Sequence, residues 1–159
     1  MWRWYFDSLR QYAVFKGRSP RVAWWSFFLF NLLFLFVLAF AELMLGFTIE
    51  NGRAGVLLGL FKLVLFIPQL ALDVRRVHDT GRSGWWIVGL WIIPMISMLV
   101  FAGAYAYANR AGIPDFGDNY FKYFVILPVL YGLWVWIITA LIGSQPGENK
   151  YGPNPHGIE

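Results

Sequence analysis

The chain has 159 residues, of which 58% are hydrophobic and 20% aromatic, while only 14% are charged. A soluble domain of this size needs more polar surface, and the apolar residues lie in blocks near the ~20 residues that cross a bilayer as a helix. The formal net charge is +4, but the basic residues flank the apolar blocks, so we expect them to orient the chain in a membrane and expect no nucleic-acid partner.

The first segment, residues 1–14, has the pattern of an amphipathic helix. Its apolar residues recur at helical spacing, with polar residues on the opposite side. Such a helix either lies in the membrane interface or packs on the protein's own loops, and the pattern fits both. The segment lacks a short apolar core with a small-residue cleavage site, so we do not expect a cleavable signal peptide.

Four apolar blocks follow, and each is long enough for a transmembrane helix. We expect these helices at about residues 22–45, 55–74, 85–108 and 123–143. A Pro/Gly-rich tail over residues 144–159 ends the chain. The predicted fold class is an all-α integral membrane protein, a single membrane domain over residues 1–159, with four transmembrane helices and an N-terminal amphipathic interfacial helix.

The distribution of Lys and Arg predicts the orientation. Nine of them lie before the first block, between the second and third blocks, or in the tail, and three lie in the connections on the opposite side. Because cytoplasmic segments carry the excess of positive charge, we expect both termini in the cytoplasm.

The stretch "LDVRRVHDTGRSGWW", between the second and third blocks, carries more charge than orientation requires. If the second helix continues through it, Asp73 lies one turn from Arg76. Asp79 then lies one turn from Arg75, so two ion pairs can form on the helix surface. Gly81 suits a left-handed helix terminator. The stretch is therefore either a helix-turn-helix corner or an anion-binding site.

The binding hypothesis rests on four arginines that the topology places at one headgroup surface. A guanidinium presents a planar fork of donors that suits a phosphate. The candidates for binding an anion or a lipid are Arg18, Arg75, Arg76 and Arg82. We expect a binding or scaffolding protein that recognises anionic lipid headgroups or a membrane partner through this face.

Polar residues inside the blocks support an alternative, a component of a small oligomeric transporter or channel. A lysine at mid-helix costs roughly 2.5–3.5 kcal/mol on insertion scales, so Lys62 needs a partner or water. We expect it to meet Glu42 of the antiparallel neighbouring helix, although it could also extend toward the interface. The predicted structural polar network consists of Glu42, Lys62, Asp73, His78 and Asp79.

Enzymatic activity is not expected. His78 and Asp79 are sequence neighbours and point roughly 100° apart on a helix, so they form no oriented acid–base couple. Two histidines and no cysteine give little support for a metal site, and no nucleotide-binding fingerprint is present. We expect no metal and no cofactor.

The tail contains three prolines and three glycines, which exclude a regular helix. We expect residues 144–157 to be non-helical but ordered, with Tyr151 anchoring them against the loop that follows the second block. The alternative is a disordered end.

Three stretches together resemble a known family: "FKGRSPRVAWWSFFLFN" (residues 15–31), "PQLALDVRRVHDTGRSGWW" (68–86) and "GENKYGPNP" (147–155). They are similar to the bacterial inner-membrane family catalogued as domain of unknown function 805, and the similarity covers nearly the whole chain. The resemblance implies a multi-pass protein of the bacterial inner (plasma) membrane and supplies no activity. Membrane lipids, a membrane-protein partner or a second copy of the chain remain the candidate partners.

Overall fold

The computed structural model describes residues 1–45 and 55–155, and its regular elements there are helices. These are α1 (Trp2–Arg10), α2 (Arg21–Leu45), α3 (Val56–Asp79), α4 (Trp85–Arg110) and α5 (Phe116–Ala140). The four longer helices have the length and composition to cross a membrane. The predicted all-α membrane fold with a short N-terminal helix is therefore confirmed.

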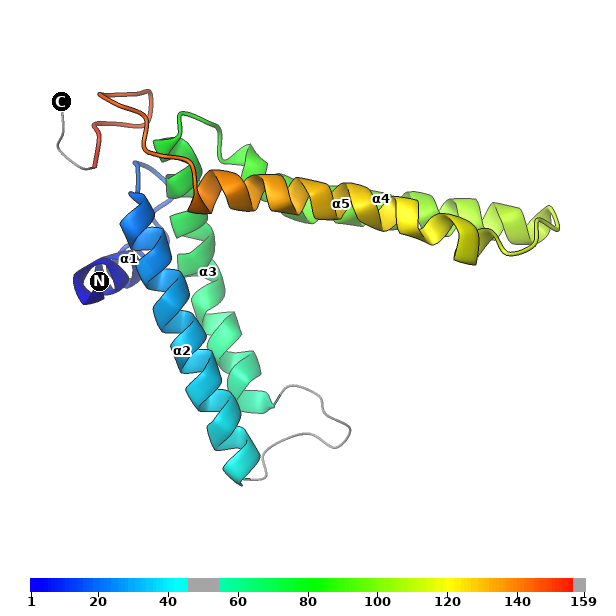
Figure 1. Ribbon diagram of the computed structural model, residues 1–159, viewed down its shortest axis with the longest axis horizontal. Coiled ribbons are helices and arrows are strands. Elements are labelled where there is room, and N and C mark those ends of the chain that lie inside the picture. Colours follow the sequence, from blue (N-terminus) through cyan, green and yellow to red (C-terminus); the bar gives the residue numbers. More distant parts are fainter. Residues whose placement is uncertain (46–54, 156–159) are drawn as a thin grey trace.

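The helices form two hairpins that share one end. Helices α2 and α3 lie side by side, α4 and α5 lie side by side, and the two pairs diverge (Figure 1). At the shared end, α1, the α3–α4 connection and the tail gather (Figure 1). We call this end the corner and define it as residues 11–20, 72–87 and 138–155.

Much of the buried apolar core lies at or near the corner. One cluster contains Tyr5, Ala23, Trp24, Phe27, Leu72 and Ala140. A second contains Val77, Ile87, Val135 and Ile138. Away from the corner all four long helices expose large apolar side chains, which suits contact with lipid. The two hairpins therefore pack against each other mainly at the corner.

Helix α3 extends five residues beyond the predicted limit of 74 and includes the charged stretch. Gly81 ends it with φ of 77°, and the amide of Arg82 donates to the carbonyl of Val77 at 3.2 Å. This is the bond from C″ back to C3 that closes a Schellman motif. The predicted left-handed terminator is confirmed.

The bounds of α1 and α5 also differ from the prediction. Helix α1 ends at Arg10 instead of 14, because Gln11 leaves the helical region with φ of −90° and ψ of 37°. Helix α5 covers Phe116–Ala140 instead of 123–143. Its first two turns contain Asp118, Asn119 and Lys122, and these polar residues hide a helix start from a hydropathy pattern.

Helix α1 packs on α2. The ring of Trp2 stacks on Phe30 with centroids 4.2 Å apart. The hydroxyl of Tyr5 donates to Asn31 Oδ1 at 3.2 Å, and burial raises the pKa of this hydroxyl. These contacts fix α1 against the membrane-spanning part of the protein.

Candidate functional site

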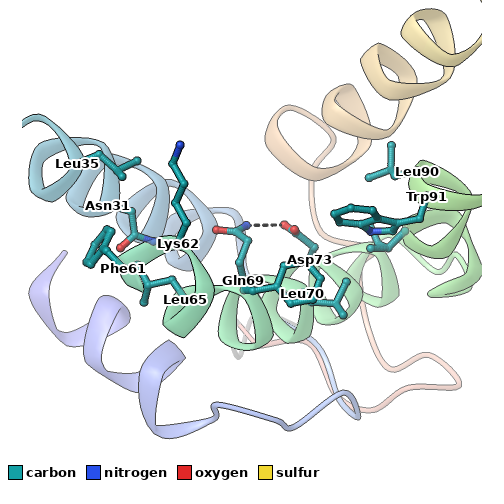
Figure 2. Close-up of a pocket in the computed structure, with 12 residues that line it drawn as sticks. Asn31, Leu35, Phe61, Lys62, Leu65, Gln69, Leu70, Asp73, Leu90 and Trp91 are labelled. Carbon is teal, nitrogen blue, oxygen red and sulfur yellow. Dashed lines mark hydrogen bonds between the residues drawn. The ribbon is translucent and has the colours of Figure 1, made fainter. Parts of the chain in front are cut away.

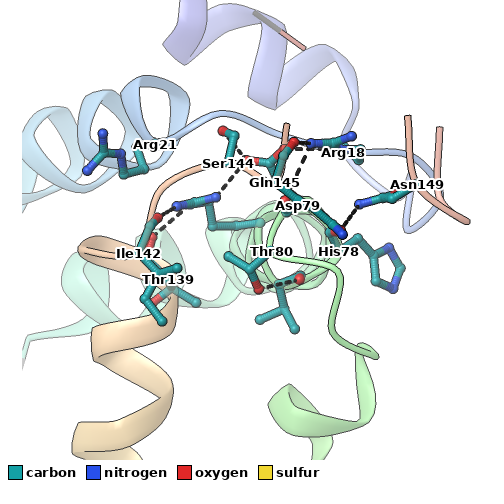
Figure 3. A network of polar contacts seen from close by, with 12 residues as sticks. Arg18, Arg21, His78, Asp79, Thr80, Thr139, Ile142, Ser144, Gln145 and Asn149 are labelled. Atoms are coloured by element: carbon teal, nitrogen blue, oxygen red, sulfur yellow. Dashed lines mark hydrogen bonds and ion pairs between the residues drawn. The ribbon is translucent and has the colours of Figure 1, made fainter. Parts of the chain in front are cut away.

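Asp79 is the centre of a buried polar network at the corner (Figure 3). Its Oδ1 accepts from Arg18 Nε at 2.9 Å, and its Oδ2 accepts from Arg76 Nη1 at 2.7 Å and from Ser144 Oγ at 2.5 Å. The side chains of both arginines and of Asp79 are at most 1% exposed. One carboxylate therefore joins the segment before α2, the end of α3 and the tail.

The remaining donors of Arg18 hold the tail. Its Nη1 donates to the carbonyls of Gly147 at 2.7 Å and Gly152 at 3.2 Å, and its Nη2 donates to the carbonyl of Gln145. The tail also forms a bridge between Asn149 and Gly152. Arg18 thus acts as a clamp on carbonyl groups that would otherwise lack partners.

Arg76 connects α3 to the end of α5. Its Nε donates to the carbonyl of Thr139 at 2.9 Å, and its Nη2 donates to that of Ile142. These carbonyls belong to the last turn of α5 and the residues after it, which have no helical partner. The bonds join the two hairpins through a single side chain.

His78 and the tail meet on the other side of α3. The His78 ring stacks on Tyr151 with centroids 3.7 Å apart and an interplanar angle of 7°. Asn149 Nδ2 donates to the carbonyl of His78 at 3.1 Å. Residues 141–155 are therefore non-helical, and Tyr151 anchors them as predicted, although on the last turn of α3 instead of on a loop after it. Residues 156 and 157 lie outside the described part.

Arg75 is buried between α1 and α3. It donates to the carbonyl of Ala71 at 3.3 Å and to Gln11 Oε1, and its Nη2 has no hydrogen-bond partner in the described residues. The predicted ion pair with Asp79 is wrong, because Asp79 faces Arg18 and Arg76 instead.

The side chains of three of the four predicted anion-binding arginines are buried and bonded to the protein itself, and only Arg82 differs among the four. Arg18 and Arg76 donate their hydrogen bonds to groups of the protein itself, and Arg75 is 3% exposed. The contacts therefore do not support an external anion on these three. Arg82, partly exposed after Gly81, makes no side-chain hydrogen bond or ion pair in the described residues and remains available.

Asp73 belongs to a second polar group, separate from Asp79. Its Oδ1 accepts from Trp24 Nε1 at 2.8 Å and from Gln69 Nε2 at 2.9 Å. The predicted pair with Arg76 is wrong, because Arg76 points to Asp79 and to the end of α5. Two neutral donors satisfy the Asp73 carboxylate instead of one cation.

Glu42 and Lys62 do not form the predicted pair. Glu42 Oε1 accepts from the amides of Leu57 at 2.6 Å and Leu58 at 3.2 Å, so Glu42 caps the start of α3 from the neighbouring helix. Its carboxylate occupies the space that a Cβ at Gly55 would need. Lys62 is exposed and has no ion pair among residues 1–45 and 55–155.

A groove of ≈ 380 Å³ lies between α2, α3 and α4 (Figure 2). Most of its lining is apolar. Four polar side chains also line it: Asn31, Lys62, Gln69 and Asp73. Two members of the predicted polar network, Lys62 and Asp73, thus line this groove together with Asn31 and Gln69, and Glu42 does not line it.

The model of the family described as "Protein of unknown function (DUF805)" matches residues 12–153. The chain belongs to this family. "Inner membrane protein YhaH" of Escherichia coli (strain K12) is 38% identical over 152 residues, which cover 96% of this chain and 95% of that protein. "Inner membrane protein YhaI" of the same strain is 35% identical over 126 residues, 74% of this chain and 99% of that protein. No solved structure matches the chain.

Sequence reasoning missed several members of the corner network. Ser144, Gln145 and Asn149 carry no charge, and the acceptors on Thr139 and Ile142 are backbone carbonyls. No sequence pattern marks such groups. A signal did exist in Asp79 itself, since an acid close to arginines of different segments can bridge them.

Proposed function

We propose that the protein is a binding protein of the bacterial inner membrane that recognises anionic lipid headgroups at one face. We define this basic face as α1 together with residues 11–16. The carrying observation is that the face exposes aromatic and cationic side chains together: Trp2, Arg3, Phe6, Arg10, Tyr12, Phe15 and Lys16. Such a combination is typical of helices that lie in the headgroup region of anionic membranes.

The cations of the basic face are free to meet lipid. The side chains of Arg3 and Arg10 are 91% and 81% exposed, and both lie more than 3.5 Å from Asp7. Exposed pairs of this kind are weak, so Asp7 does not withdraw these arginines from solvent. Arg82 adds a further unpaired cation at the corner.

The corner network supports this role by fixing the face. Tyr5 and Trp2 hold α1 on α2, while Arg18 and Asp79 hold the beginning of α2 to the end of α3. A face preorganised in this way loses less entropy when lipid binds. The excess of Lys and Arg at this end favours the cytoplasmic side, and two relatives carry "inner membrane" in their names.

Binding fits the arrangement better than transport by one chain. The described helices diverge as two hairpins and do not surround a central channel (Figure 1). Transport would require further chains to close the groove.

The test compares lipid selectivity of the full-length protein in vesicles with spin-labelled phosphatidylglycerol and phosphatidylcholine. The triple variant Arg3→Gln, Arg10→Gln, Lys16→Gln should lose most of the preference for phosphatidylglycerol, because each cation near an anionic surface contributes roughly 1 kcal/mol. High salt should weaken the wild-type preference in the same direction.

The matched control is the double variant Arg110→Gln, Lys122→Gln, which removes exposed cations from the opposite end of the second hairpin. It should keep the wild-type preference. If the triple variant also keeps it, the basic face does not recognise anionic lipid.

A further inference from the structure

The groove between the hairpins carries polar groups on one face of α3. Lys62, Gln69 and Asp73 are spaced by seven and eleven residues, which brings them to the same side of a helix. Asn31 of α2 joins them, and Figure 2 shows the polar groups along the groove with apolar side chains between. The volume of ≈ 380 Å³ falls within the ~300–1,000 Å³ of small-molecule sites.

The charges in this groove are not equally satisfied. Asp73 accepts two hydrogen bonds, from Trp24 and Gln69. Lys62 has no hydrogen bond or ion pair within the described ranges, and the carboxylate of Glu42 is turned to the start of α3. Eleven residues separate Lys62 from Asp73, about 16 Å along the helix, which excludes a direct pair. Lys62 is therefore the cation of the groove, without a hydrogen bond or ion pair in the described residues, and it lies at the opposite end from the hydrogen-bonded Asp73.

The position of Lys62 restricts what can neutralise it. It follows Val56 by six residues and so lies about 9 Å along α3 from the end that faces away from the corner. A lysine side chain can extend from this depth toward the headgroups of that leaflet. A lipid phosphate can therefore reach the ammonium without entering the middle of the membrane.

The rest of the lining excludes a water-soluble anion as the natural occupant. Leu65, Phe66, Leu70, Leu90 and Trp91 surround the space next to the polar groups. Such a surface at membrane depth suits a hydrocarbon chain, and a hydrated anion would lose its water there without replacement.

We propose that this groove binds one anionic phospholipid from the leaflet opposite the corner, with its phosphate on Lys62 and an acyl chain along α3 and α4. Asn31, at one side of the groove, contacts Tyr5 of α1, but Lys62 and the apolar lining do not belong to the basic face. The inference therefore goes beyond the proposed function and rests on different cations. The positive charge selects the lipid, and the apolar lining holds it.

The experiment measures lipid binding to the full-length, detergent-purified protein by native mass spectrometry. Phosphatidylglycerol and phosphatidylcholine with identical acyl chains are the probes. The wild type should retain one phosphatidylglycerol in preference to phosphatidylcholine. Lys62→Met should weaken phosphatidylglycerol binding about fivefold or more, because it removes the cation and keeps an unbranched side chain only one atom shorter. Lys62→Arg should retain the lipid.

Lys122→Met is the control for generic attraction. Lys122 is also exposed and also lies six residues after the start of its helix, α5, but it does not line the groove. This variant should bind phosphatidylglycerol like the wild type. Equal losses for Lys62→Met and Lys122→Met would overturn the proposal.

Three further arms separate the alternatives. Leu90→Trp should fill the groove and reduce the binding of both lipids. Unchanged binding would show that the lipid binds elsewhere. Free glycerol 3-phosphate should not displace the lipid, and full displacement would indicate a site for a soluble anion. The basic-face triple variant should keep the retained lipid, and its loss there would assign that lipid to α1 instead. The melting temperatures of all variants should match that of the wild type, which would show that a loss of lipid binding does not come from unfolding.

Discussion

Replacing Asp79 by Asn tests the role of the corner network. Asn keeps the shape of the side chain but leaves the guanidinium groups of Arg18 and Arg76 without a counter-charge, at exposures of 1% and 0%. Removing one partner from a buried ion pair costs about 3–5 kcal/mol. The two pairs share one carboxylate, so their losses do not add fully. We expect Asp79→Asn to lower the free energy of unfolding by about 3–5 kcal/mol.

The assay is unfolding of the purified protein in mixed micelles by titration with SDS, followed by circular dichroism. Asp7→Asn is the matched control, because Asp7 also faces two arginines, at 3.8 and 3.7 Å, but on an exposed surface. It should cost about 0–1 kcal/mol. A double-mutant cycle of Asp79→Asn with Arg76→Met should show coupling between the two sites.

A small effect would refute this reasoning. If Asp79→Asn costs no more than Asp7→Asn, water or alternative acceptors satisfy the arginines, and the network does not hold the hairpins together. If Asp79→Asn is destabilising but shows no coupling to Arg76→Met, the loss comes from another contact of Asp79.

Further outcomes follow from the hairpin, the tail and the orientation. Gly55→Ala should destabilise the protein by about 1–3 kcal/mol in the same titration, because its Cβ would overlap the Glu42 carboxylate. Glu42→Ala should cost about 1–2 kcal/mol, because two amides of α3 lose their acceptor. Lys62→Met should leave the free energy of unfolding unchanged both in the wild type and in Glu42→Ala, and coupling between the two substitutions would indicate the ion pair that the structure lacks. Tyr151→Ala should speed proteolysis of the tail in the folded protein, whereas Tyr151→Phe, which keeps the ring stacked on His78, should not. Equal proteolysis rates for the two variants would show that the stacked ring does not hold the tail. A C-terminal reporter active only in the cytoplasm should give a signal, and a silent fusion would contradict the orientation.

Local sequence patterns predicted the elements of the fold. Blocks of about 20 apolar residues predict membrane helices without knowledge of their neighbours, because the bilayer sets the required length and satisfies no backbone group itself. Gly81 likewise ends α3 through its own backbone freedom. The anchoring of the tail by Tyr151 also followed from composition, since prolines and glycines exclude a helix while one aromatic ring offers a contact.

The partners of the charged side chains could not be predicted in the same way. Spacing along α3 makes both Asp73–Arg76 and Arg76–Asp79 feasible, and only the position of α5 decides, because its unpaired carbonyls attract Arg76 toward Asp79. The same holds for Glu42, whose depth alone matched Lys62 but whose carboxylate meets the free amides at the start of α3.

The sequence by itself therefore determined the helices, their number and the membrane as their solvent, because those depend on residues close together in the chain. The tertiary structure alone decided which arginines are consumed by the protein and which cation, Lys62, is left without a partner in the groove. The physical reason is that a buried charge takes the acceptors nearest in space, and at the corner those acceptors come from segments more than 60 residues apart.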